Sequence, residues 1–283
     1  MNNRLLTLIL ALFLVANFPT ISFAAQVPAW LAAMKVNGSA RVATDGSGGV
    51  TGVWFFGDVD EDPLTASTFA KLAELPELRF LSLAFSDGQL PVGDFRAFVK
   101  RSNIEVLQFE CGTTVTKEII DAVSYMTALK KLRIISCVGF DSSAAASLDK
   151  LSSLVSLSAP HCHLDNAFAP TIRKMGQIEE LSLSYTEIGD SVLVALGENQ
   201  HLRILRLAGT KISDAGLSAL GRCKGLEELD LTKTNVSIEA IQRLCDLGRI
   251  RTIVLSTDYL SKSAVKVLAT KYPKISITVV PGS

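Results

Sequence analysis

The residues whose types could do chemistry gather in one short stretch. His161, Cys162 and His163 are adjacent, and Asp165 follows two residues later. Histidine, cysteine and aspartate all bind zinc, but a zinc site needs its ligands to converge on one point. Adjacent side chains in an extended segment alternate in direction, so we expect Cys162 to point inward and both histidines to point outward. The stretch therefore favours a structural role for Cys162, with a metal site as the alternative.

The sequence contains no familiar catalytic motif. His-Glu-x-x-His, Gly-x-Ser-x-Gly and the dinucleotide-binding fingerprint are all absent. The three histidines, His161, His163 and His201, have no aligned carboxylate that would favour acid–base catalysis. The 28 basic residues balance the 28 acidic residues, which argues against a nucleic-acid-binding surface. We therefore expect no enzyme activity, no cofactor and no resident metal.

A repeat of 24 residues organises the second half of the chain. A pattern of Ile/Leu-x-x-Leu/Ile-x-Leu begins at Ile178, Leu202, Leu226 and Ile250. Looser copies begin at Val50, Leu78, Ile104, Leu129 and Leu154, with steps of 24 to 28 residues. A last alternating segment, Ile275-Ser-Ile-Thr-Val279, follows the last clear copy. We therefore count nine units and a closing strand.

Each part of the repeat has a physical cause. Leu181 and Leu183 alternate with polar residues, so they point to one side of a short strand. One such strand cannot bury its apolar side alone, so parallel stacking is predicted. The return segment of about 15 residues is long enough for a crossover that contains a helix. Asp190 and Asp214 stand where these helices should begin, and we expect their carboxylates to accept the free backbone N–H groups there.

The segment Leu205-Arg-Leu-Ala-Gly-Thr-Lys-Ile-Ser-Asp-Ala-Gly-Leu217 resembles the leucine-rich-repeat family in its short, cysteine-containing form. It is also similar to exported bacterial members of that family, and the resemblance covers residues 50 to 280. It implies an α/β fold, a right-handed β-α solenoid of horseshoe shape, with a parallel sheet on the concave side and helices on the convex side. It implies partner binding and no catalytic residues. Pro170 departs from the pattern, so the return segment there should be irregular or begin its helix at the proline.

The five cysteines are odd in number and spread along the chain, unlike a dense disulfide framework. Cys137 and Cys162 align with three threonines of later repeats, Thr186, Thr210 and Thr234. We predict a buried turn position whose small polar side chain satisfies backbone groups between coils. A Cys137–Cys162 disulfide is the alternative, because neighbouring coils lie about 4.8 Å apart.

The first residues predict an export signal. Arg4 precedes an apolar run over residues 5 to 15, and small residues stand at the two positions that signal peptidase recognises. We expect residues 1–24 to be a signal peptide that is cleaved after Ala24, and the alternative is a retained membrane anchor. The mature protein is then secreted or resides in the periplasm or cell envelope, without a stable membrane span.

The remaining chain divides into two predicted parts. Residues 25–49 are expected to form an N-terminal cap, made of a helix and a hairpin strand around a Gly-rich turn. Such a cap would cover the core of the first repeat, which an open solenoid end exposes. Residues 50–283 are the leucine-rich-repeat domain, with its closing strand at the C-terminus.

Outward residues of the predicted strands form rows on the concave face. Our candidate partner-binding residues there are Trp54, Phe56, Phe80, Lys131, Arg133, Glu180, Arg206, Glu228 and Asp230. The aromatic residues gather at the N-terminal end and resemble a binding hot spot, unless the cap covers them. The charged residues form a basic spot and an acidic spot, for which scattered solvated charges are the alternative.

These features predict a non-enzymatic protein-interaction module, exported from the cytoplasm. It should bind a protein or peptide on its concave face, without nucleic acid, and we expect a monomer. The alternatives are a substrate-recognition adaptor resembling the leucine-rich-repeat subunits of ubiquitin ligases, an envelope structural protein, and a hydrolase whose site is not recognisable.

Overall fold

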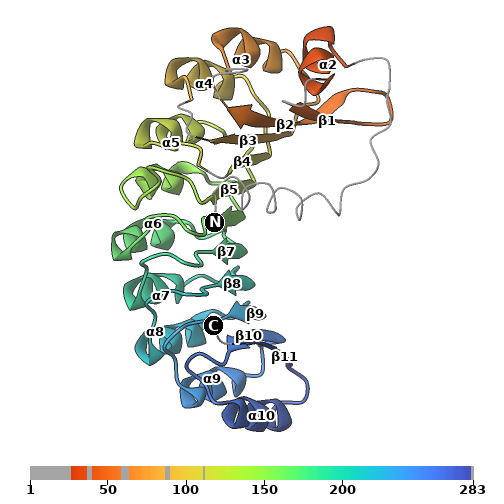
Figure 1. The fold of residues 1–283 in the computed structure, drawn as a ribbon. Coiled ribbons are helices and arrows are strands. Elements are labelled where there is room, and N and C mark those ends of the chain that lie inside the picture. The colour runs from red at the N-terminus through yellow and green to blue at the C-terminus, as the bar shows by residue number, and fades with distance from the viewer. Residues whose placement is uncertain (1–26, 37–39, 59–63, 87–89, 111, 282–283) are drawn as a thin grey trace.

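A computed structural model describes residues 27–36, 40–58, 64–86, 90–110 and 112–281. Figure 1 shows an arc in which strands line the inner side and helices line the outer side. The strands form a single 11-stranded sheet in the order β1 to β11. The predicted α/β horseshoe, with its parallel sheet and outer helices, is therefore confirmed. The predicted signal peptide, residues 1–24, lies outside the described residues.

The strands follow the predicted repeat. They are β1 (Ala40–Thr44), β2 (Val50–Asp58), β3 (Phe80–Ser86), β4 (Val106–Glu110), β5 (Lys131–Ile135), β6 (Ser156–Ser158), β7 (Glu180–Ser182), β8 (Ile204–Arg206), β9 (Glu228–Asp230), β10 (Thr252–Ser256) and β11 (Ser276–Val280). Strands β2 to β10 correspond to the nine predicted units, and β11 corresponds to the closing strand. All neighbouring pairs from β2 to β11 are parallel.

Each strand from β2 to β10 is connected to the next strand through a helical segment on the outer side. The α-helices are α2 (Ala29–Val36), α3 (Ala66–Leu72), α4 (Val92–Val99), α5 (Lys117–Val123), α6 (Ala169–Lys174), α7 (Asp190–Leu196), α8 (Asp214–Ala219), α9 (Ile238–Cys245) and α10 (Lys262–Lys271). Three 3₁₀ helices, η1 (Ala144–Lys150), η2 (Asn166–Phe168) and η3 (Leu220–Arg222), complete the set. Pro170 lies in the first turn of α6, which begins one residue earlier at Ala169 and directly follows η2.

The segment before the repeats contains a helix and a hairpin. Strand β1 pairs antiparallel with β2. In the turn between them, Asp45 Oδ1 accepts hydrogen bonds from the backbone N–H groups of Ser47 and Gly49, both at 2.9 Å. Gly48 has a φ of 87°, a left-handed conformation that glycine adopts without steric cost.

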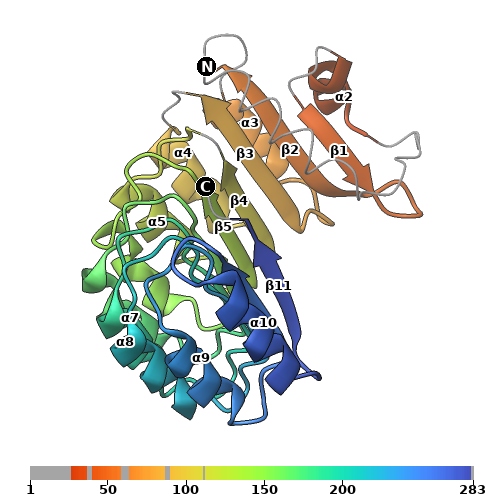
Figure 2. The same cartoon turned by 60° about the horizontal axis from the view of Figure 1, so that its bottom comes forward.

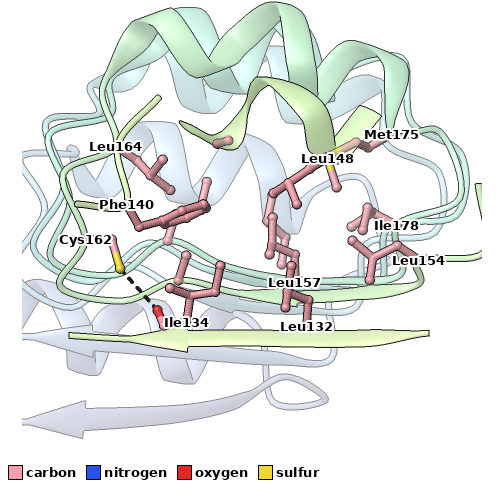
Figure 3. Packing of buried hydrophobic residues seen from close by; sticks show 14 of the residues in the cluster. Leu132, Ile134, Phe140, Leu148, Leu154, Leu157, Cys162, Leu164, Met175 and Ile178 are labelled. Carbon is pink, nitrogen blue, oxygen red and sulfur yellow. Dashed lines mark hydrogen bonds between the residues drawn. The ribbon is translucent and has the colours of Figure 1, made fainter. Parts of the chain in front are cut away.

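The core lies between the sheet and the helical layer. Figure 3 shows Leu132 and Ile134 of β5 pointing toward Phe140 and toward Leu148 of η1. All four side chains are fully buried. Burying a leucine side chain stabilises the fold by about 2 kcal/mol, so the repeated leucines account for much of the stability.

Larger side chains fill the core of the N-terminal repeats. Phe69 contacts Phe95 and Phe98 with ring centroids 5.6 Å apart, and Phe95 contacts Phe109 at 6.1 Å. The strands from β7 onward bury mainly leucines. The core of the first repeats therefore packs through aromatic rings, whereas the later strands pack through leucines.

We predicted that the carboxylates of Asp190 and Asp214 accept the free N–H groups at the starts of their own helices, and this prediction is wrong. Both residues begin a helix, but neither is its N-cap: Ser213 caps α8, and its Oγ accepts from the N–H of Ala215 at 3.3 Å. The Asp190 carboxylate instead accepts two hydrogen bonds from Ser213 in the following repeat. The capping position is occupied by Gly189 in α7 and by Ser213 in α8, and the aspartate that follows it bonds to the next coil.

The aligned cysteines and threonines are buried, as predicted. The hydroxyls of Thr186, Thr210 and Thr234 each donate to the carbonyl three residues earlier in their own coil, just after the strand, at 2.6 Å. The prediction that these hydroxyls bond backbone groups between coils is therefore wrong for the threonines. Cys162 Sγ donates to the carbonyl oxygen of Ile134 in the preceding coil at 3.1 Å (Figure 3). Cys162 carries no disulfide, so the alternative of a Cys137–Cys162 bridge is wrong. Burial raises the pKa of the Cys162 thiol to about 11.

Candidate binding surface

The strand register aligns the predicted outward residues along the concave face. One row reads Trp54, Ser82, Gln108, Arg133, Ser158, Ser182, Arg206, Asp230 and Val254. The neighbouring row reads Gly52, Phe80, Val106, Lys131, Ser156, Glu180, Ile204, Glu228 and Thr252. Each predicted pairing is present, so eight of the candidate residues fall into two continuous rows, while Phe56 lies two residues beyond Trp54 on β2.

The three candidate aromatic residues do gather on β2 and β3. The rings of Trp54 and Phe80 lie 4.4 Å apart at 35°, and both side chains are half-buried. Gly52 makes room for this pair, because a Cβ there would lie 3.3 Å from the Trp54 ring. The guanidinium of Arg41, on β1, lies 5.4 Å from the centre of the Phe56 ring. The hairpin strand therefore covers part of Phe56, as the alternative interpretation required.

Two buried polar atoms in the row that begins at Trp54 have no hydrogen-bond partner among the described residues. Arg133 is half-buried, and its Nε has no hydrogen-bond partner within the described ranges. Ser82 Oγ, two strands away in the same row, is also buried and unpartnered there. A buried polar atom without a partner costs about 1–3 kcal/mol. Both atoms are almost inaccessible to solvent, so a ligand on this face would not contact them directly.

Glu110 is a member of this surface that the sequence reasoning missed. It lies on β4 and continues the outward alternation of Val106 and Gln108. Burial raises the pKa of Glu110, and the nearby positive charge of Arg133 partly offsets the increase. The outward alternation along β4 was the signal that could have identified this residue.

The remaining charged candidates lie farther along the rows. Ser156 Oγ donates to Glu180 Oε2 at 3.2 Å, and Asp230 Oδ1 accepts from the N–H of Thr232 at 2.9 Å. Arg206 is exposed and lies opposite Asp230 in the strand register. Neither Arg206 nor Lys131 forms an ion pair with another described residue. Their charges are therefore available to a partner.

The edge at which the strands end carries an aromatic stack that sequence reasoning also missed. The rings of His161 and Tyr185 lie 4.5 Å apart and 8° from parallel. Tyr185 is 43% exposed, and its ring lies over Gly209, where a Cβ would come within 2.6 Å of Cδ1. All three residues occupy the same repeat position, directly before the buried Cys/Thr position, so the 24-residue spacing could have revealed them.

This edge has an unusual backbone in successive repeats. Ser136, His161, Tyr185, Gly209 and Lys233 all have φ values between 52° and 63°. The conformation turns their N–H groups toward the next coil: His161 donates to the carbonyl of Ser184, and Tyr185 to that of Ala208. The strand ends are therefore held together by backbone hydrogen bonds, while the side chains project outward.

The side chains of the His161-Cys162-His163 stretch point in alternating directions. Cys162 is buried and both histidines are exposed, so the predicted alternation is confirmed. Across the described residues, no group of three or more His, Cys, Asp or Glu side chains could hold a metal ion. None of the helices in the described ranges is long and apolar enough to cross a membrane.

Sequence comparison identifies the repeat unit directly. A family model described as Leucine Rich repeat matches residues 198–221, which contain β8 and α8. The same strand-turn-helix unit stacks in register through the sheet. The chain has the leucine-rich-repeat fold. No curated protein matches this chain in sequence.

Several solved structures resemble it. Internalin C2 from Listeria monocytogenes is 18% identical, with a TM-score of 0.51, and the match covers 73% of this chain and 80% of internalin C2. A second internalin from that organism is 16% identical, with a TM-score of 0.47 and coverage of 75% and 70%. The plant peptide hormone receptor RGFR1, in complex with RGF2, is 15% identical, with a TM-score of 0.47 and coverage of 75% and 34%. The internalin C2 likeness shows a shared fold.

Proposed function

We propose that this leucine-rich-repeat protein is a non-enzymatic module that binds a protein or peptide on its concave face. The observation that carries the proposal is the pair of exposed cations on this face, Lys131 and Arg206, which form no ion pair with another described residue. Arg133 and Arg206 lie in one row, and Lys131 lies beside Arg133 in the neighbouring row. Polypeptides supply both carbonyl acceptors and carboxylates, so a peptide backbone with acidic side chains fits this row.

The aromatic pair at one end of the row supports the same function. Trp54 and Phe80 offer large, half-buried rings in the same two rows as these charged residues. Aromatic and arginine residues contribute a large share of the binding energy at protein interfaces. A partner that lies along the row from β2 to β9 would contact both kinds of residue.

The decisive experiment compares two variants with matched charge changes. The concave variant combines Arg133→Glu, Arg206→Glu and Asp230→Lys. The control variant combines Arg173→Glu, Lys224→Glu and Glu198→Lys, which are exposed residues outside the concave rows. A partner captured by the wild-type protein should bind the concave variant at least tenfold more weakly, measured by isothermal titration calorimetry, because two attractive charges become repulsive. Equal affinity for wild type and a folded concave variant would exclude this face.

We also propose that the protein is exported, with residues 1–24 as a cleaved signal and residues 25–49 as a cap on the first repeat. The support is the order of Arg4, the apolar run and the small residues that end at Ala24. Expression of the full chain followed by mass measurement of the exported product should give a protein that begins at Ala25. A product that retains residues 1–24 would contradict cleavage and favour the anchor.

A further inference from the structure

The last strand of the sheet has an open edge. Strand β11 pairs in parallel with β10, and no other strand in the described chain pairs with its second side. Figure 2, in which this end of the solenoid comes forward, shows β11 as the final strand with α10 alongside. The N–H of Ser276 donates to the carbonyl of Arg251 at 2.8 Å. Successive residues of a parallel strand direct their backbone groups to opposite sides, so Ile277 and Val279 direct theirs to the open edge.

The same two residues line an apolar hollow. Ile277 and Val279 form its wall on the strand side, and Val265 and Ala269 of α10 form the opposite wall. The hollow has a volume of about 240 Å³, and Val279 is 43% exposed. An exposed edge with apolar side chains is a template for pairing with another strand, and proteins commonly recognise extended segments in this way.

The charge around the hollow selects among possible occupants. Lys262 and Lys266 complete its lining, and neither forms an ion pair with another described residue. The last 25 residues of the chain contain four lysines and no Asp or Glu. A second copy paired at this edge would bring its own lysines close to these, which is unfavourable. An occupant with carboxylates is favoured instead.

We propose that β11 accepts, as an additional strand, an extended segment of a partner protein whose α10-facing side chains are an apolar residue flanked by Asp or Glu. The backbone of this segment exchanges hydrogen bonds with Ile277 and Val279. Its apolar side chain fills the hollow, and its carboxylates meet Lys262 and Lys266. This surface is separate from the concave rows and does not depend on their proposed function.

A pair of synthetic peptides tests the proposal on the full chain. The acidic peptide Thr-Glu-Thr-Val-Thr-Glu-Thr places Glu, Val and Glu on one face of a strand, and the control peptide replaces both glutamates by lysine. Fluorescence anisotropy of the labelled peptides should show saturable binding of the acidic peptide, at least tenfold tighter than the lysine peptide. Equal binding of the two peptides would overturn the proposal.

Two protein variants test the backbone and charge contributions separately. Ile277→Pro removes an N–H that faces the open edge and leaves the β10–β11 hydrogen bonds in place. This variant should therefore bind the acidic peptide at least tenfold more weakly than the wild type. The control variant Ile277→Val should bind it with unchanged affinity. Lys262→Glu with Lys266→Glu should reverse the preference between the peptides, whereas the control pair Arg222→Glu with Lys224→Glu should preserve it. A folded Ile277→Pro protein that binds normally would contradict the strand-addition geometry.

Two further outcomes have defined meanings. Concentration-dependent dimerisation that Ile277→Pro abolishes would assign the edge to a second copy and overturn the choice of an acidic segment. If the concave variant binds the acidic peptide as tightly as the wild type, the peptide site is separate from the concave face. This conclusion holds even if the proposal of partner binding on the concave face fails. Loss of peptide binding in a folded concave variant would place the peptide on the concave face and overturn the assignment to β11.

Discussion

Asp190 of one repeat holds Ser213 of the next with both of its carboxylate oxygens. The Ser213 N–H donates to Oδ1 at 2.8 Å, and the Ser213 hydroxyl donates to Oδ2 at 2.6 Å. Asp214 and Ser237 repeat the arrangement one coil later, at 2.7 and 2.6 Å. The Ser213-Asp214 pair at the start of α8 is therefore a joint between coils: Ser213 bonds to Asp190 of the preceding coil, and Asp214 bonds to Ser237 of the next coil.

Removing the carboxylate should weaken this joint. Asp190→Ala eliminates two hydrogen bonds and leaves the partly buried N–H of Ser213 without its acceptor, so the free energy of unfolding should fall by about 2–3 kcal/mol. Asp190→Asn keeps one acceptor oxygen, so its free energy of unfolding should fall less than that of Asp190→Ala. Urea unfolding followed by circular dichroism measures both, with the exposed Glu198→Ala as control. A loss of the same size in Glu198→Ala would show that the effect is not specific to the joint.

The glycine of the repeat motif serves the same joint. A Cβ on Gly216 would lie 2.8 Å from the carboxylate carbon of Asp190 and 2.9 Å from its Cα. Gly216→Ala should therefore destabilise the protein by about 1–3 kcal/mol through overpacking. In the Asp190→Ala background the cost should be smaller, because the carboxylate is gone and only the contact with Cα remains. A double-mutant cycle of unfolding free energies measures the difference, and strict additivity would refute the contact.

The serine–aspartate joints also predict a pH dependence. The hydrogen bond from Ser237 lowers the pKa of Asp214 below its usual value of 3.8, and the hydrogen bond from Ser142 does the same for Asp165. A lowered pKa in the folded state means that the stabilisation is fully present above the unfolded pKa and is lost as the pH falls through the folded pKa. Stability should therefore decline between about pH 5 and pH 2.

Ser237→Ala isolates one joint in that titration. The pKa of Asp214 should return toward its usual value, so the variant should lose less stability on acidification than the wild type, from a lower starting value at neutral pH. Unfolding free energies at a series of pH values measure both slopes. Parallel curves for the two proteins would show that the Ser237 hydroxyl does not set the pKa of Asp214.

The sequence predicted the register of the sheet because each repeat buries an apolar pair, such as Leu181 and Leu183, and a shift by one residue would expose both. It did not predict the partner of Asp190, because a residue at the start of a helix could cap its own helix or reach the next coil. The His161–Tyr185 stack was missed for a related reason. Both residues adopt positive φ, which is uncommon for residues other than glycine, so the spacing alone did not indicate which way their side chains point.

The buried thiols should be unreactive until the solenoid unfolds. Burial raises the pKa values of Cys162, Cys223 and Cys245 to about 11, and the thiolate is the reactive form. At pH 8 each thiol is therefore almost entirely protonated and shielded from reagents. Titration with 5,5′-dithiobis(2-nitrobenzoic acid) should release little chromophore from these three residues in the native protein and full colour in urea. Cys162→Ser should lower the number of thiols titrated in urea by one and leave the number titrated in the native protein unchanged. A lower number in the native protein would contradict burial of Cys162. An unchanged number in urea would show that Cys162 is in a disulfide.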